Sequence, residues 1–207
     1  MPTDPRRLAV VSADHSAAAA APPGIDPAAF AAACLADTYE VLADLIEVGS
    51  GIAGPDAVSD LLWPGSRLFP AGSTIAELAE LLRDQVDELV VVPADVPDLP
   101  GLVLAKIFKV LHRVDLAVAP QRGGTGCVAI GVSLPLANWI EPELLDVDGQ
   151  PHDQLATDRS RRSRWSLAPD WHRLRTPADV HRLDPGLEGW EETRALLSGR
   201  SLASGEW

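Results

Sequence analysis

Short apolar runs, often β-branched, alternate along the chain with longer segments in which apolar residues recur every three or four positions. The short runs predict strands, and the longer segments predict helices with one buried face. The clearest predicted strands are residues 7–12, 67–69, 89–92, 115–120 and 127–132. This alternation predicts an α/β fold.

The run at residues 89–92, Leu-Val-Val-Val, has no polar position, which is typical of a strand covered on both faces of a parallel sheet. Asp95 follows this strand, and ligands of open α/β sheets bind outside the carboxyl ends of the strands. A carboxylate at this point is well placed to hold a metal-bound phosphate. The alternative is that Asp95 only caps the turn at residues 95–97.

A helix is predicted directly after Asp95. Asp98 is expected to be its N-cap, with the helix beginning near Leu99 or Pro100 and ending near Leu111. The spacing from this helix to the strand at residues 115–120 favours a parallel pair of strands joined by a right-handed crossover.

Other helix starts carry capping residues. Asp26 precedes a proline and opens a helix over about residues 27–45. Ser73 or Thr74 pairs with Glu77 as a capping box, and residues 176–179, Thr-Pro-Ala-Asp, form another.

The chain has 207 residues, of which 46% are hydrophobic, so we expect one domain spanning residues 1–207. Its net charge of −13 argues against a nucleic-acid-binding surface, because an anionic duplex repels such a protein. Small-molecule chemistry is the more natural expectation. A homodimer is compatible with the sequence but not indicated by it.

Cysteine content and hydropathy indicate a cytoplasmic protein without a membrane segment. Cys34 and Cys127 lie far apart and form no metal-ligand cluster, so neither a structural zinc nor a disulfide scaffold is predicted. The apolar run at residues 8–11 is too short for a signal peptide, and no stretch is long enough to cross a bilayer.

Positive charge gathers late in the chain. Residues 159–182 hold seven of the seventeen Lys and Arg residues. Arg122, Arg173 and Arg175 are our candidates for phosphate contacts, because guanidinium suits bidentate phosphate binding. The alternative is a solvated loop, which we prefer for residues 159–164.

Three common catalytic patterns do not fit the sequence. The histidines form no HxxxH or HxH pair, and His172 is more simply an ordinary hydrogen-bonded side chain than a metal ligand. Residues 123–126, Gly-Gly-Thr-Gly, lack the lysine of a P-loop and precede a strand. No serine lies in a nucleophile-elbow pattern.

Three segments together resemble the nucleotide-diphospho-sugar transferase superfamily. They are Pro-Ala-Asp-Val-Pro-Asp-Leu at residues 93–99, Ala-Pro-Gln-Arg-Gly-Gly-Thr-Gly at 119–126, and Leu-Arg-Thr-Pro-Ala-Asp-Val at 174–180. Within that superfamily the chain is most similar to the DUF2064 group of glycosyltransferases and to guanylyltransferases related to the enzyme that activates 2-phospho-lactate.

The resemblance implies a GT-A-like, three-layer α/β/α sandwich with a mostly parallel sheet. It implies that Asp95 is the catalytic carboxylate and binds Mg²⁺ or Mn²⁺ bridging the phosphates of a nucleotide or sugar nucleotide, with Asp179 as a second metal candidate. The residues expected to bind substrate are Asp98, Arg122, Gly123, Gly124, Thr125, Gly126, Arg173 and Arg175.

Two departures from the family pattern define two function hypotheses. The loop after the first strand usually carries Lys and Arg, whereas residues 17–24 carry no cation, and Arg175 occupies the place of a late acid. The first hypothesis is a metal-dependent nucleotidyl- or glycosyl-transferase. The second is a non-catalytic relative, a pseudoenzyme, that binds a ligand or serves in assembly.

Overall fold

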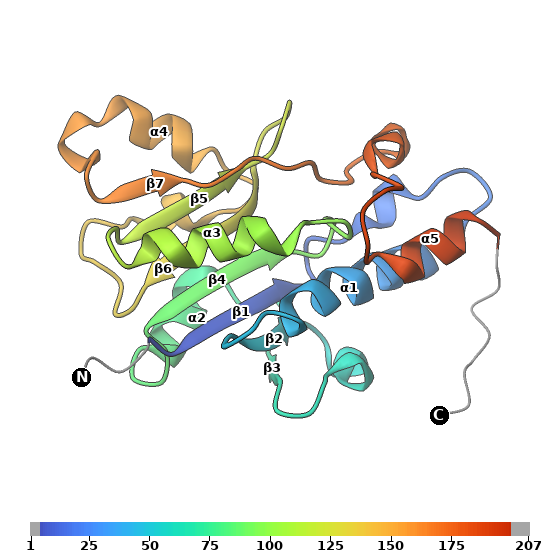
Figure 1. The fold of residues 1–207 in the computed structure, drawn as a ribbon, viewed down its shortest axis with the longest axis horizontal. Coiled ribbons are helices and arrows are strands. Elements are labelled where there is room, and N and C mark those ends of the chain that lie inside the picture. Colours follow the sequence, from blue (N-terminus) through green and yellow to red (C-terminus); the bar gives the residue numbers. More distant parts are fainter. Residues whose placement is uncertain (1–4, 200–207) are drawn as a thin grey trace.

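A seven-stranded sheet organises the protein, and the computed structural model describes residues 5–199 of the chain (Figure 1). The strands are β1 (Arg7–Ser12), β2 (Gly49–Ala53), β3 (Arg67–Phe69), β4 (Glu88–Pro93), β5 (Leu116–Pro120), β6 (Cys127–Ser133) and β7 (Trp165–Leu167). Their order across the sheet is β3-β2-β1-β4-β6-β5-β7. Only β6 runs antiparallel to its neighbours, so the predicted mostly parallel sheet is confirmed.

Helices cover both faces of this sheet. The α-helices are α1 (Pro27–Ala43), α2 (Ile75–Leu82), α3 (Gly101–Leu111), α4 (Pro151–Thr157) and α5 (Glu191–Leu197). Short 3₁₀ helices span Ala17–Ala20, Asp56–Leu61, Pro142–Leu145, Arg159–Arg161 and Pro177–Arg182. The apolar residues of α3 and of the second half of α1 share one core cluster, and those of α2 and α4 share another, which confirms the predicted α/β/α layering. Phe30 and Cys34 of α1 belong to a third cluster. In Figure 1, α5 lies alongside α1, with which it is in contact.

Strand β4 is buried along its whole length, as its apolar run predicted. Leu89 and Val91 pack into the core cluster beneath α2, whereas Val90 and Val92 pack into the cluster beneath α1 and α3. Successive side chains of a strand point to opposite faces, so both layers of helices meet at β4.

The capping residues begin helices where the sequence placed them. Asp26 accepts a hydrogen bond from the Ala29 amide at 2.8 Å, and Thr74 and Glu77 form a reciprocal capping box at the start of α2. Thr176 also forms its capping box, although the helix it begins is a 3₁₀ helix.

The predicted parallel pairing of the strands on either side of α3 is wrong. β4 and β5 point the same way, but β6 lies between them and is antiparallel to both. The chain leaves β5 through a short hairpin and returns as β6 into the gap. Local spacing sets the direction of β5, but it carries no information about the strand inserted beside it.

The predicted role of Asp98 as a helix N-cap is also wrong. Helix α3 begins at Gly101, and Pro100 takes the N-cap position without a side-chain hydrogen bond. Asp98 is buried and instead accepts hydrogen bonds from Trp171 Nε1 at 3.1 Å and from the Asp184 amide at 3.3 Å. Contacts with a segment more than 70 residues away therefore outweigh the local capping preference.

Two expectations from composition concern the cysteines and membrane-spanning helices. Cys34 and Cys127 are both free and buried, in line with the absence of a predicted disulfide. Within residues 5–199, no helix has the length and apolar character needed to cross a membrane. The single-domain organisation stays a prediction.

Candidate functional site

The direction of strand addition changes between β1 and β4. From β1 the chain adds β2 and β3 on one side and then crosses to β4 on the other, where Ser12 pairs with Pro93. In open α/β sheets this switch point is where ligands bind, outside the carboxyl ends of the strands. Asp95 follows β4 at this place.

A pocket of about 350 Å³ opens at the switch point. It lies between the loop after β1, the start of α2 and the segment that precedes α4. Its lining residues are Ser12, Asp14, His15, Gly72, Ser73, Thr74, Ile75, Ala76, Val91, Pro142, Leu145, Asp146 and Val147. We call it the switch-point pocket.

The polar lining of the switch-point pocket comes from the end of β1 and the loop after it, from the start of α2 and from Asp146. Asp14 accepts a hydrogen bond from the Gly72 amide at 2.6 Å, which ties this loop to the start of α2. His15 is the only lining side chain that can carry positive charge. The pocket wall therefore offers little positive charge of its own to a phosphate.

Asp95 is buried and is paired with two arginines from one extended segment. Its Oδ1 accepts a hydrogen bond from Arg173 Nε at 2.8 Å, and Arg175 Nε lies 3.2 Å from its Oδ2. Its backbone carbonyl accepts from the Leu174 amide at 2.8 Å. Burial raises the pKa of the Asp95 carboxyl, and the charges of Arg173 and Arg175 act in the opposite direction.

Asp148 is the second carboxylate at these arginines. Arg173 Nη1 donates to Asp148 Oδ1 at 2.9 Å, Arg175 Nη2 donates to the same oxygen, and His15 Nδ1 lies 3.2 Å from Oδ2. Burial opposes ionisation of Asp148, but Arg173, His15 and Arg175 together outweigh it and lower its pKa. Asp95, Asp148, Arg173, Arg175 and His15 form what we call the arginine cluster.

Arg173 is completely buried. Besides its two carboxylate partners, its Nη1 donates to the carbonyls of Cys127 at 3.1 Å and Val147 at 3.0 Å. Its Nη2 has no hydrogen-bond partner in the part of the chain that the structure describes. A buried donor without an acceptor is costly, so this atom is suited to an acceptor from a ligand or a water molecule.

Of the predicted glycine loop, only Gly126 reaches the arginine cluster. It has a φ of +102°, and a Cβ there would lie 2.9 Å from the Val147 carbonyl and 3.4 Å from Arg173 Nη1. Gly123, Gly124 and Thr125 are exposed on the turn between β5 and β6. Arg122 is exposed too, with Nη2 3.0 Å from Asp170 Oδ1 and its guanidinium over the Trp171 ring.

The carboxylates of Asp179 and Asp98 are occupied by contacts other than the guanidinium groups of Arg173 and Arg175. Asp179 Oδ2 accepts hydrogen bonds from the Thr176 amide at 2.8 Å and the Arg175 amide at 3.1 Å, so it caps the 3₁₀ helix. Asp98 Oδ1 lies 3.0 Å from His172 Nε2 in addition to its bond from Trp171.

The residues around Asp95 do not fit Mg²⁺ or Mn²⁺. Both oxygens of Asp95 face guanidinium groups, whose positive charge opposes a divalent cation at the same place. Across residues 5–199, no three His, Cys, Asp or Glu side chains gather as metal ligands.

Sequence reasoning missed His15 and Asp148. His15 follows the first strand, where the resemblance places a phosphate loop, so its position was a usable signal. Asp148 lies in a turn far along the chain from both Asp95 and Arg173, and nothing in its local sequence indicates where it packs.

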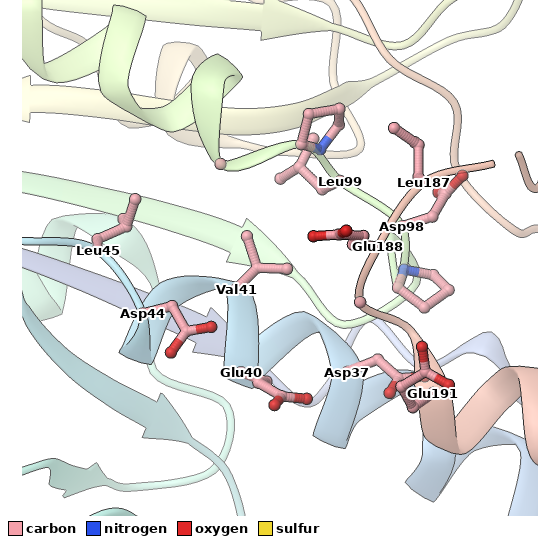
Figure 2. A pocket seen from close by; sticks show the side chains of 14 residues that line it. Asp37, Glu40, Val41, Asp44, Leu45, Asp98, Leu99, Leu187, Glu188 and Glu191 are labelled. Carbon is pink, nitrogen blue, oxygen red and sulfur yellow. The ribbon is translucent and has the colours of Figure 1, made fainter.

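A second pocket, of about 430 Å³, lies between α1, the start of α3 and the segment before α5 (Figure 2). Figure 2 shows carboxylates around it, from Asp37, Glu40, Asp44, Asp98, Glu188 and Glu191. A wall of this charge repels phosphate groups, so this pocket is a poor candidate for a nucleotide.

The comparisons with known proteins yield structural likeness only. No protein-family model matches the chain, and no curated protein matches it. A structure described as a candidate nucleotide-diphospho-sugar transferase from Desulfovibrio desulfuricans G20 is 18% identical, with a TM-score of 0.62 over 95% of this chain and 98% of that one.

The structures of a synthase and of a synthetase are similar as well. The 4-diphosphocytidyl-2C-methyl-D-erythritol synthase of Anaerococcus prevotii DSM 20548 is 10% identical, with a TM-score of 0.54 over 86% of this chain and 93% of that one. CMP:2-keto-3-deoxy-manno-octonic acid synthetase, solved in complex with CTP, is also 10% identical, with a TM-score of 0.52 over 94% and 99%.

These likenesses define the class of protein by its fold. The chain has the α/β fold of the candidate nucleotide-diphospho-sugar transferase, as the resemblance of its three segments predicted, and shares this fold with the synthase and the synthetase. The narrower similarity to the DUF2064 group and to guanylyltransferases stays a prediction.

Proposed function

We propose that this protein binds a nucleotide or sugar nucleotide in the switch-point pocket without a divalent cation, as a non-catalytic relative of the transferases whose fold it has. The pocket lies at the carboxyl ends of β1 and β4, where this class of sheet accepts ligands. The fold is that of a synthetase solved with CTP, which supports a nucleotide as the class of ligand.

The pairing of Asp95 is the observation that carries the proposal. A metal-dependent transferase needs free carboxylate oxygens that can hold the cation against the phosphates. Here Arg173 and Arg175 occupy both oxygens of Asp95. The two guanidinium groups therefore stand where a divalent cation would bind, so the chain's own arginines, and not a metal, are the proposed source of positive charge for the ligand.

Thermal unfolding with a ligand panel tests the proposal. We expect a nucleoside triphosphate, with CTP first, or a sugar nucleotide to raise the Tm in excess EDTA. At a ligand concentration of 100 Kd the stabilisation is about 2.7 kcal/mol, or several degrees for a chain of this size.

An Ala76→Phe variant places a large ring in the pocket at the start of α2 and should abolish the shift. Ala105→Phe, on the exposed side of α3, is the matched control and should preserve it. If no nucleotide or sugar nucleotide shifts the Tm, or if Ala76→Phe shifts like the control, the proposed binding site is wrong.

The second candidate is the metal-dependent nucleotidyl- or glycosyl-transferase expected from the resemblance. The observation that favours it is the position of Asp95 after the central strand of a transferase fold. It predicts a Tm shift that needs Mn²⁺ and disappears in Asp95→Asn, with release of pyrophosphate or a nucleoside diphosphate. A shift of equal size in EDTA would exclude it.

A further inference from the structure

We propose that Asp148 holds the place of a ligand phosphate in the free protein, and that a phosphate group displaces it from His15, Arg173 and Arg175. This inference deepens the proposed function, on which it rests for the position of the ligand. It assigns His15, Arg173 and Arg175 as the phosphate subsite and Asp148 as a carboxylate that competes with phosphate for this subsite.

Three donors from two distant parts of the chain meet at Asp148. Arg173 Nη1 and Arg175 Nη2 donate to one carboxylate oxygen, and His15 Nδ1 lies 3.2 Å from the other. Guanidinium pairs with carboxylate and with phosphate in the same geometry. The three donors therefore form an oxyanion site that the chain itself occupies.

Asp148 is the exposed member of the arginine cluster. Its side chain is 44% exposed, whereas that of Asp95 is 2% exposed. It lies in a turn held by the Asp146 side chain, which accepts from the Asp148 amide at 2.9 Å. Asp148 can leave into solvent by a change in this turn, while Asp95 cannot leave without opening the core.

The charge balance changes when Asp148 leaves. With Asp148 in place, two arginines face two carboxylates and the cluster is close to neutral. Without it, the same arginines face Asp95 alone and carry a net positive charge, which attracts a phosphate. This positive charge compensates for the missing cations of the loop after β1.

Arg173 Nη2 offers hydrogen-bonding capacity to the incoming group, because it is buried and unpartnered in the described chain. His15 lines the switch-point pocket and also faces Asp148. A nucleotide in that pocket can therefore reach the subsite with its phosphates.

Isothermal titration in excess EDTA tests the inference, with inorganic pyrophosphate and CTP as probes. Asp148→Asn should bind pyrophosphate at least about tenfold more tightly than the unmodified protein, a change of about 1.4 kcal/mol. Asp87→Asn is the matched control, because Asp87 is also 44% exposed and paired with an arginine, Arg6, at 2.9 Å. It should not change the affinity.

The gain must depend on the other cluster members. Adding Arg175→Gln or His15→Gln to Asp148→Asn should remove the gain in pyrophosphate affinity. Both side chains are partly exposed, so we expect the double variants to fold, and circular dichroism will verify this. Equal affinities of Asp148→Asn and the unmodified protein would overturn the inference, as would a gain that survives Arg175→Gln.

The two proposals fail in different ways. Tighter pyrophosphate binding without any nucleotide binding would support the phosphate subsite and refute the proposed nucleotide pocket. Nucleotide binding that Ala76→Phe abolishes and Asp148→Asn leaves unchanged would support the pocket and refute the role of Asp148.

Discussion

Asp37 shows how one buried carboxylate holds two helices together. It lies on α1, and its oxygens accept hydrogen bonds from the amides of Glu192 at 3.0 Å and Thr193 at 2.7 Å. These are two of the orphan amides in the first turn of α5, whose own N-cap residue, Trp190, makes no side-chain cap. Asp37 therefore caps α5 from another helix.

This carboxylate should make stability depend on pH. Burial raises its pKa from 3.8 to about 6. Between these values the folded protein binds more protons than the unfolded chain, so the contribution of Asp37 falls as pH rises and is lost above about pH 6. Relative to Asp37→Asn, the free energy of unfolding of the unmodified protein should fall by roughly 2–3 kcal/mol as the pH rises across this window.

Urea unfolding at several pH values measures this difference. Asp44→Asn is the control, because Asp44 is exposed and lines the same pocket beside α1 as Asp37. It should leave the pH dependence of the free energy of unfolding unchanged. A slope that persists in Asp37→Asn would contradict the assignment.

Arg173 should be essential for folding stability. Arg173→Gln leaves Asp95 buried with one partner and removes donors from two backbone carbonyls, so we expect a loss of about 3–5 kcal/mol. Asp95→Asn added to it should cost less than the sum of the two single changes, because the unpaired charge is gone. Denaturant unfolding of the unmodified protein, the two single variants and the double variant measures the coupling between Asp95 and Arg173. Strictly additive losses of stability would contradict the prediction.

Part of the candidate site could be predicted from residue types and order alone. Asp95, Arg173, Arg175 and Gly126 were proposed for one site, and the structure brings them together, while their function stays a proposal. The motifs also predict Asp179 and Asp98 as site residues. In the structure Asp179 caps the 3₁₀ helix that begins after Thr176, and Asp98 accepts a hydrogen bond from Trp171, which is distant in sequence. Pairing with Asp148 depends on packing between segments far apart in sequence, which no local pattern encodes.

At the scale of elements, one glycine sets how closely α3 approaches the sheet. A Cβ at Gly131 in β6 would overlap the Ile107 methyl of α3 and lie 3.3 Å from Val90 Cγ2. Gly131→Ala must push α3 outwards or force a rotamer change, at a cost of about 1–3 kcal/mol.

Gly101→Ala should stabilise the folded protein by about 0.4–1 kcal/mol. The new Cβ would meet only Leu45, at 3.7 Å, and the substitution lowers the conformational entropy of the unfolded chain.

Thermal or urea unfolding of these two variants should therefore give changes of opposite sign. A neutral Gly131→Ala would mean that the contact between β6 and α3 is loose. A destabilised Gly101→Ala would mean that the first turn of α3 cannot accept a side chain.

Most of the strands could be predicted one by one, but their order across the sheet could not. Apolar runs identify β1, β4, β5 and β6 because burial on both faces requires such runs. The insertion of β6 between β4 and β5 follows from long-range pairing. Strand β7 was missed because it has three residues and follows a basic loop, so no periodicity marks it.

At the scale of the whole molecule, an excess of negative charge is the dominant feature. The net charge is −13, and many arginines are already paired with carboxylates, as Arg6 is with Asp87 and Arg122 with Asp170. The carboxylates gathered around the pocket of about 430 Å³ repel one another, although Glu191 is paired with Arg194. Exposed ion pairs contribute little each, so repulsion should outweigh them.

Salt should therefore stabilise this protein. Raising the ionic strength from about 0.01 M to about 0.15 M shortens the Debye length from about 30 Å to about 8 Å and so screens the long-range repulsion. The buried ion pair of Asp95 and Arg173 is screened much less. We expect the urea midpoint to rise with NaCl at pH 7 and the rise to be smaller at pH 4.5, where part of the acidic excess is protonated. Sucrose at matched osmolality controls for effects unrelated to charge. A midpoint that falls with salt would show that surface ion pairs, and not repulsion, govern the electrostatic stability of the molecule.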